Sequence, residues 1–172
     1  MESLLETLKQ NYTSNPIFAY FSQKEFDQFL NVTHIETFEA GEVMFKTGDD
    51  PKGLYFILQG KVQITKVRPG KPPRVLAELE APTVLGEMAM LIHRKRSSTA
   101  TTLTATSVLL FDIHSFNQLL DDDVLMAYKL SHNMGAILAK KMETMNKAMM
   151  EMNQQFKEFS SFKNSLFSDW NF

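Results

Sequence analysis

The chain has 172 residues, of which 44% are hydrophobic and 22% charged, as in folded globular proteins and unlike disordered or fibrous ones. Its 18 basic and 20 acidic residues give a net charge of −2, which argues against a broad nucleic-acid-binding surface. The absence of cysteine excludes disulfides, cysteine zinc sites and thiol catalysis. No apolar run approaches the ~18 residues of a membrane span, and the N-terminus lacks a signal-peptide pattern. We therefore expect a cytoplasmic protein that does not contact a membrane.

Residues 1–32 form the first predicted segment, which we expect to be helical. Leucines between residues 4 and 8 give one apolar stripe, and phenylalanines between residues 18 and 29 give another. Ser22, with Glu25 three residues later, has the pattern of a capping box. This pattern predicts a helix that begins just after Ser22.

Residues 33–113 have the short apolar or alternating segments of β-strands, separated by turns. The apolar run 54–58 predicts a strand buried on both faces. Three prolines within residues 69–73 predict an exposed hairpin loop, because proline cannot donate to a central ladder. About eight strands with frequent turns indicate a mainly β fold, either a sandwich or a small barrel. The expected strands cover residues 35–38, 43–45, 54–58, 62–67, 75–79, 99–103 and 107–113, with one more ending at Leu85.

Residues 114–160 are predicted to form a hinge and a long helix. A short helix is expected over 114–120, and the acids at 121–123 would complement the positive N-terminus of the long helix. Beyond it, apolar residues step alternately by four and three, as in the seam of a coiled coil. These seam residues are Leu138, Met142, Met145, Met149, Met152, Phe156 and Phe159.

A single helix would leave the seam exposed, so we predict a parallel homodimer through residues 138–159. The alternative is a helix that packs along its own domain. Residues 161–172 form an aromatic tail, which either folds back on the same chain or docks an unidentified partner protein or the other subunit. Trp170 is the expected anchor of such a contact.

The turn at Gly86 has the residue types of a nucleotide site. Gly86 follows a strand and allows a tight turn and the close approach of a ligand, because it has no Cβ. The short helix predicted over 87–91 begins with unpaired N–H groups, which attract anions. The carboxylate of Glu87 would instead accept hydrogen bonds from neutral hydroxyls, such as those of a ribose.

Arg96 lies ten residues further on, beside the hydroxyls of Ser97 and Ser98. An arginine fork next to hydroxyls is suited to bind a phosphate. Phosphate and sugar recognition together indicate a nucleotide.

The segment resembles the phosphate-binding cassette of the cyclic nucleotide-binding domains, in which Gly-Glu precedes apolar residues, a short loop, an arginine and small residues. Upstream, Phe38-x-x-Gly41-x-x-Met44-x-x-x-Gly48-Asp49 and Leu54-Tyr55-Phe56-Ile57-Leu58-x-Gly60-x-Val62 are similar to the first strands of that family. The resemblance covers roughly residues 15–145. The chain departs from the family at Lys95, where a proline is common, and has no visible helix-turn-helix after Met145.

The resemblance implies an eight-stranded β-roll, or jelly roll, flanked by N-terminal helices and a long C-terminal helix. It implies that Arg96 pairs with the cyclic phosphate and Glu87 with the ribose 2′-hydroxyl, and that residues 138–146 of the long helix cap the base. The other residues it places at the ligand are Gly86, Met88, Ala89, Ser97 and Ser98 around the phosphate, and Ile64, Leu76 and Ala77 around the base or sugar.

The function implied by the resemblance is that of a sensor, not an enzyme, which binds cAMP or cGMP and repositions its C-terminal helix to signal to a partner. One alternative is a β-roll without ligand that acts through the coiled coil and aromatic tail. Another is a subunit of a DNA-binding complex, although we do not expect direct DNA binding. The four histidines show no metal-ligand spacing, so no metal is expected.

Overall fold

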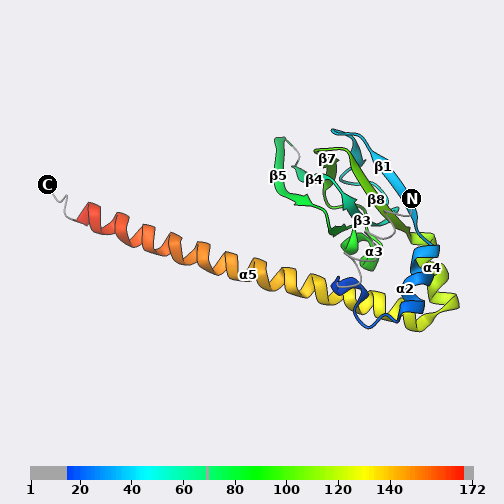
Figure 1. Cartoon of the computed structure of the whole chain (residues 1–172). Coiled ribbons are helices and arrows are strands. Elements are labelled where there is room, and N and C mark those ends of the chain that lie inside the picture. Colours follow the sequence, from blue (N-terminus) through cyan, green and yellow to red (C-terminus); the bar gives the residue numbers. More distant parts are fainter. Residues whose placement is uncertain (1–14, 69, 169–172) are drawn as a thin grey trace. The chain divides into compact units, whose positions relative to one another are not determined.

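A computed structural model describes residues 15–68 and 70–168, and side chains for residues 15–67 and 70–160. Eight strands form two antiparallel sheets (Figure 1). One sheet has the order β1 (His34–Phe38), β8 (Thr106–Asp112), β3 (Gly53–Gln59) and β6 (Thr83–Leu85). The other has the order β2 (Val43–Phe45), β7 (Thr99–Thr102), β4 (Lys61–Arg68) and β5 (Lys71–Glu80). The helical elements are η1 (Pro16–Phe18), α2 (Gln23–Asn31), α3 (Glu87–Ile92), α4 (Ile113–Asp122) and α5 (Val124–Ser168).

Strand β3 is buried on both faces, as the apolar run 54–58 predicts. Tyr55 and Ile57 face the core of the roll, which also contains Val62, Ala100 and Val108. On the other face, Phe56 meets the aromatic rings of the N-terminal segment, since it stacks on Phe18 at 5.5 Å between centroids and meets Phe29 edge-on at 5.4 Å. The N-terminal helices therefore cover the outer face of this sheet.

The β4–β5 hairpin differs from its sequence prediction. Residues 69–73 are predicted as loop, but β5 begins at Lys71 and includes Pro72 and Pro73. β5 is an edge strand with a neighbour on one side only. Proline is tolerated there, because its missing N–H group need not break a hydrogen bond to another strand. The predicted loop is thus too long, and the prolines form part of the edge strand.

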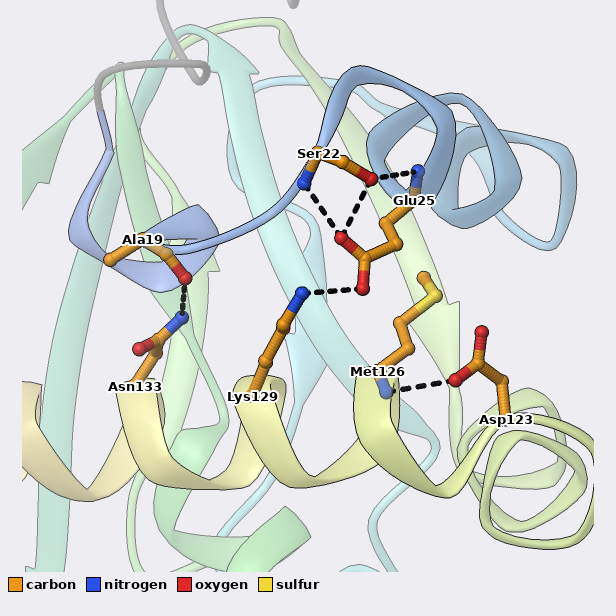
Figure 2. Close-up of polar contacts among 7 residues, drawn as sticks. All are labelled: Ala19, Ser22, Glu25, Asp123, Met126, Lys129 and Asn133. Atoms are coloured by element: carbon orange, nitrogen blue, oxygen red, sulfur yellow. Dashed lines mark hydrogen bonds and ion pairs between the residues drawn. The ribbon is translucent and has the colours of Figure 1, made fainter.

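The boundary between α4 and α5 lies inside the acidic run 121–123. Asp121 and Asp122 belong to the last turn of α4, so they do not begin the long helix as predicted. Asp123 alone caps α5, because its carboxylate accepts a hydrogen bond of 3.0 Å from the N–H of Met126 (Figure 2).

The N-terminal segment is held to the first turns of α5 by polar contacts (Figure 2). The predicted capping box is confirmed, since Ser22 and Glu25 each accept a hydrogen bond from the other's backbone N–H. The other carboxylate oxygen of Glu25 pairs with Lys129 Nζ at 2.6 Å, and both side chains are largely buried. Asn133 Nδ2 donates to the carbonyls of Ile17 and Ala19 at 3.0 and 2.7 Å. These contacts join segments more than 100 residues apart.

Helix α5 continues to Ser168, beyond the predicted end near Phe159. Contacts divide the chain after Met134, so that α5 contributes its first turns to one unit and the rest to another. Six seam residues of the second unit, from Met142 to Phe159, are 56–69% exposed in the single chain. In the part of the chain that the structure describes, no helix is long and apolar enough to cross a membrane.

We expect Lys129→Met to destabilise the fold because Glu25 would lose its cation. The hydrogen bond from Lys129 lowers the pKa of Glu25 from 4.5 to about 2, helped by the backbone of Ser22. The carboxylate therefore stabilises the fold above pH ~4.5, and this contribution is lost as the pH falls toward ~2. Urea unfolding should show a loss of about 1 kcal/mol at pH 7 and a smaller loss at pH 3.

Lys24→Met is the matched control, since Lys24 is exposed on α2. The control should leave the free energy of unfolding nearly unchanged at both pH values. Equal losses for the two variants, or a Lys129→Met loss independent of pH, would contradict the role assigned to this ion pair.

Candidate functional site

The turn between β6 and α3 depends on Gly86. Its φ of +98° is left-handed, and it forms the N-cap of α3, which begins at Glu87 as predicted. A Cβ built on Gly86 would lie 2.4 Å from Arg96 Nη1 and 2.8 Å from the carbonyl oxygen of Gly53. Gly86 is therefore required both for its backbone conformation and for the space that the arginine occupies.

The side chain of Arg96 is buried inside the roll, with 4% of its surface exposed. Its Nη2 donates a hydrogen bond of 2.7 Å to the carbonyl of Gly53, and Nη1 makes a longer contact of 3.5 Å with that of Gly86. The guanidinium carbon lies 4.3 Å from the ring centre of Phe45 and 5.4 Å from that of Tyr55. These carbonyl and aromatic contacts partly replace the water that a buried cation loses.

The Nε–H group of Arg96 is buried without a hydrogen-bond partner. Burial lowers the pKa of Arg96, whereas Tyr55 and Glu87 oppose this change. Burial also raises the pKa of Tyr55, which keeps the phenol neutral beside the guanidinium. An arginine remains charged in such a setting, so a cation whose Nε–H donor is unused lies at the centre of the site.

Only one of the three consecutive basic residues turns inward. Arg94 is exposed, and Lys95 points to the loop 48–50, where it contacts Asp50 at 3.1 Å and the carbonyl of Gly48 at 3.2 Å. The backbone of Arg96 is held by the same loop through two hydrogen bonds of 2.8 Å, to Asp49 and from Gly48. The structure thus distinguishes Arg96 from its basic neighbours.

The remaining cassette residues differ in exposure. Ala89 is buried, Glu87 and Ser98 are partly buried, and Met88 and Ser97 are exposed. Glu87 lies near enough to Arg96 for its charge to act on the guanidinium. The structure thus brings the carboxylate of Glu87 near the guanidinium of Arg96, and Ser97 and Ser98 follow Arg96 directly in the chain.

The strands β4 and β5 bring two of the predicted base-side residues together. Ile64 pairs with Ala77 across the hairpin, and with Ala100 of β7 on its other side. Leu76 falls at a register shift, has no cross-strand partner and is 52% exposed. The ladder therefore places Ile64 and Ala77 side by side, while Leu76 bulges outward.

Sequence reasoning missed the residues that hold Arg96, namely Phe45, Tyr55 and the carbonyl of Gly53. Nothing local marks them, because they lie 41 to 51 residues before Arg96 in the chain. A cavity of about 300 Å³ lies elsewhere, between α2, α4 and the start of α5, and contains none of the predicted ligand-binding residues. Among the described residues, no cluster of histidines and carboxylates could hold a metal ion.

We expect Gly86→Ala to destabilise the protein by about 1–3 kcal/mol, because a Cβ would strain the backbone and displace Arg96. Gly135→Ala is the control, because a Cβ there meets nothing within 4 Å and alanine favours a helix. Urea unfolding should show a loss for the first variant and a gain of up to about 1 kcal/mol for the second. Equal stability of Gly86→Ala and wild type would contradict this packing.

The chain matches the family model of the cyclic nucleotide-binding domain over residues 35–123. The cyclic AMP receptor protein of Thermus thermophilus is 28% identical over 128 residues, which are 74% of this chain and 57% of that protein. The cAMP-dependent protein kinase regulatory subunit of Dictyostelium discoideum is 35% identical over 85 residues, 48% of this chain and 26% of that one. The chain thus spans about half of one relative and a quarter of the other.

Solved structures agree on the fold. The cAMP-bound structure of PfPKA-R is 30% identical, with a TM-score of 0.63 over 69% of this chain and 42% of that one. A cyclic nucleotide-binding domain from Methylobacillus flagellatus has a TM-score of 0.72 over 87% of this chain and 82% of that one, at 21% identity. Eight antiparallel strands in two sheets, with flanking helices and a long C-terminal helix, match these β-rolls.

Proposed function

This chain belongs to the cyclic nucleotide-binding domain family, and from that premise we propose that it is a sensor that binds cAMP or cGMP and signals through its C-terminal helix. The observation that carries the proposal is the buried Arg96 guanidinium with its unused Nε donor. The proposed sensor involves no catalytic step, because every cassette residue has a role in binding the ligand. Two relatives carry cAMP in their names, which makes cAMP the first ligand to test.

The cyclic phosphate would be bound by Arg96. Its Nη2 already donates to Gly53, so Nε and the remaining Nη protons are the donors left for an anion. A phosphate oxygen at Nε would satisfy the one buried polar side-chain atom that lacks a partner among the described residues. Backbone N–H groups near Met88 and Ala89, with the hydroxyls of Ser97 and Ser98, would complete the contacts to phosphate.

The ribose and base would lie beside the phosphate. Glu87 would accept a hydrogen bond from the 2′-hydroxyl, since its carboxylate repels the phosphate and suits a neutral donor. Ile64, Leu76 and Ala77 would contact the base or sugar. These apolar contacts do not distinguish adenine from guanine, so the sensor proposal includes both nucleotides.

We expect Arg96→Ala to weaken binding of cyclic nucleotide by about 2–5 kcal/mol, because it removes a charge-assisted contact to a buried phosphate. Fluorescence anisotropy with fluorescent derivatives of cAMP and cGMP measures the affinity. Arg94→Ala is the matched control, since that exposed arginine lies two residues away and should leave the affinity unchanged.

Arg96→Lys is a second variant that keeps the positive charge and loses the fork of donors. It tests whether a loss of affinity comes from lost hydrogen bonds to the ligand and not from a lost fold. Circular dichroism checks that both Arg96 variants are folded. Wild-type affinity in a folded Arg96→Ala protein would contradict the proposal.

We also propose a parallel homodimer through the seam of α5. Its methionines and phenylalanines are more than half exposed in the single chain, and an apolar stripe of this length is costly to leave in water. The residues that flank the seam on α5 carry one charge, that of Lys141. The others are Ala139, Asn146, Ala148, Asn153 and Gln155. Two copies could therefore meet along this face with little repulsion between like charges.

Met149→Glu should dissociate the dimer, because it puts a carboxylate into the apolar seam. Met150→Glu is the matched control, since Met150 is 73% exposed and lies one residue off the seam. Sedimentation velocity should show dimers for wild type and Met150→Glu and monomers for Met149→Glu. A monomeric wild type, or equal effects of the two variants, would contradict the dimer.

A β-roll without ligand that acts through α5 is the second candidate. It is favoured by the two carbonyls that already accept from Arg96, since these satisfy part of the guanidinium without a nucleotide. The anisotropy titration distinguishes the candidates, because only the sensor binds a cyclic nucleotide. In both cases α5 carries the signal or the contact to a partner protein.

A further inference from the structure

Positive charge is concentrated on the β4–β5 hairpin. Between Ile64 and Ala77 the chain has four basic residues and no acidic one, namely Lys66, Arg68, Lys71 and Arg74. The rest of the chain keeps 14 of the 18 basic residues against all 20 acidic ones. The hairpin is therefore a local positive region on a chain that is otherwise negative.

Basic residues occupy opposite backbone positions in the ladder of this hairpin. Lys66 is directly opposite Arg74, and Arg68 is opposite Lys71. Like charges in opposite positions destabilise a sheet. At the other end of the hairpin, Lys61 makes an ion pair of 3.2 Å with Glu80. Among residues with described side chains, no carboxylate forms an ion pair with Lys66, Lys71 or Arg74, so none of these side chains compensates the repulsion at this end.

The register places two of these cations on the face of the hairpin that turns toward the core. Val62 is fully buried, and Ile64 packs against the core cluster. Side chains alternate along a strand, so Lys66 lies on the same face as both, and Arg74 opposite it shares that face. This face thus passes from buried core, through Ile64 and Ala77, to Lys66 and Arg74.

The ladder also places Lys66 next to the cassette. Strands β4 and β7 pair through Ile64 with Ala100 and end with Thr65 opposite Thr99. Lys66 is one residue beyond that last pair, and Thr99 follows Arg96 by three residues. Since paired strands lie about 5 Å apart and each residue adds about 3.4 Å along a strand, we place the backbone of Lys66 within about 10 Å of Ser97 and Ser98, and that of Arg74 one strand further away.

We propose that Lys66 and Arg74 form an electrostatic guide that draws the anionic nucleotide into the site. This inference rests on the proposed function, and it assigns to the hairpin a role in the rate of capture. A net charge of −2 gives the ligand no overall attraction to the chain. Positive charge within about one Debye length of the site raises the local concentration of an anion and its association rate. The guide does not require contact with the bound ligand.

The test is stopped-flow binding of fluorescent derivatives of cAMP and cGMP to wild type and to the double variant Lys66→Gln/Arg74→Gln. At low ionic strength the double variant should associate about fivefold more slowly and dissociate at the wild-type rate. The difference should vanish at high salt, where the charges are screened. Lys147→Gln/Lys157→Gln is the matched control, because it removes the same charge from exposed positions of α5 beyond residue 146.

The outcomes distinguish electrostatic guidance by Lys66 and Arg74 from direct contact of these side chains with the ligand. An unchanged association rate in the double variant, or an equal slowing in the control, overturns the guide. Faster dissociation with unchanged association would mean that the two side chains contact the ligand directly, which also overturns it. A wild type that binds neither nucleotide refutes the proposed function, and the guide falls with it.

Discussion

The burial of one cation organises this molecule. Moving a guanidinium out of water costs several kcal/mol unless acceptors and aromatic faces surround it. Arg96 meets this requirement with the carbonyls of Gly53 and Gly86 and with the rings of Phe45 and Tyr55. These partners come from β2, β3 and the turn before α3, so one side chain fixes the cassette against both sheets. The same packing requires a residue without a Cβ at position 86, because a Cβ there would meet the guanidinium of Arg96.

The partners of Arg96 also connect the cassette to the helices. Gly53 pairs with Asp112, whose carboxylate caps α4 through the N–H of Ser115 at 2.7 Å. The N–H of Ile113, the first residue of α4, donates to the carbonyl of Lys52. Further along the chain, Lys129 holds α5 to the N-terminal segment. Contacts at Lys52 and Gly53 thus hold the start of α4, and in the proposed switch a ligand that competed with Gly53 for the guanidinium would act on them.

Sequence patterns predicted the structural features that depend on residues close together in the chain. The capping box of Ser22 and Glu25 and the Gly86 turn are short-range features, and the doubly buried strand β3 follows from a continuous apolar run. Contacts between distant segments left no such pattern, as the pairing of Glu25 with Lys129 and the aromatic surroundings of Arg96 show. The loop predicted over 69–73 was too long because an edge strand tolerates proline, which depends on strand order.

The proposed sensor requires that Arg96 binds the cyclic phosphate through its Nε–H group. The chain has four arginines, so a nitrogen-15 NMR spectrum of their Nε–H groups is simple, and Arg96→Lys assigns the signal of Arg96 by its loss. We expect saturating cAMP or cGMP to shift this signal and to slow its exchange with water, while adenosine and guanosine, which lack the phosphate, do neither. A cyclic nucleotide that binds and leaves the Arg96 signal unchanged, or a protein that binds neither nucleotide, would contradict it.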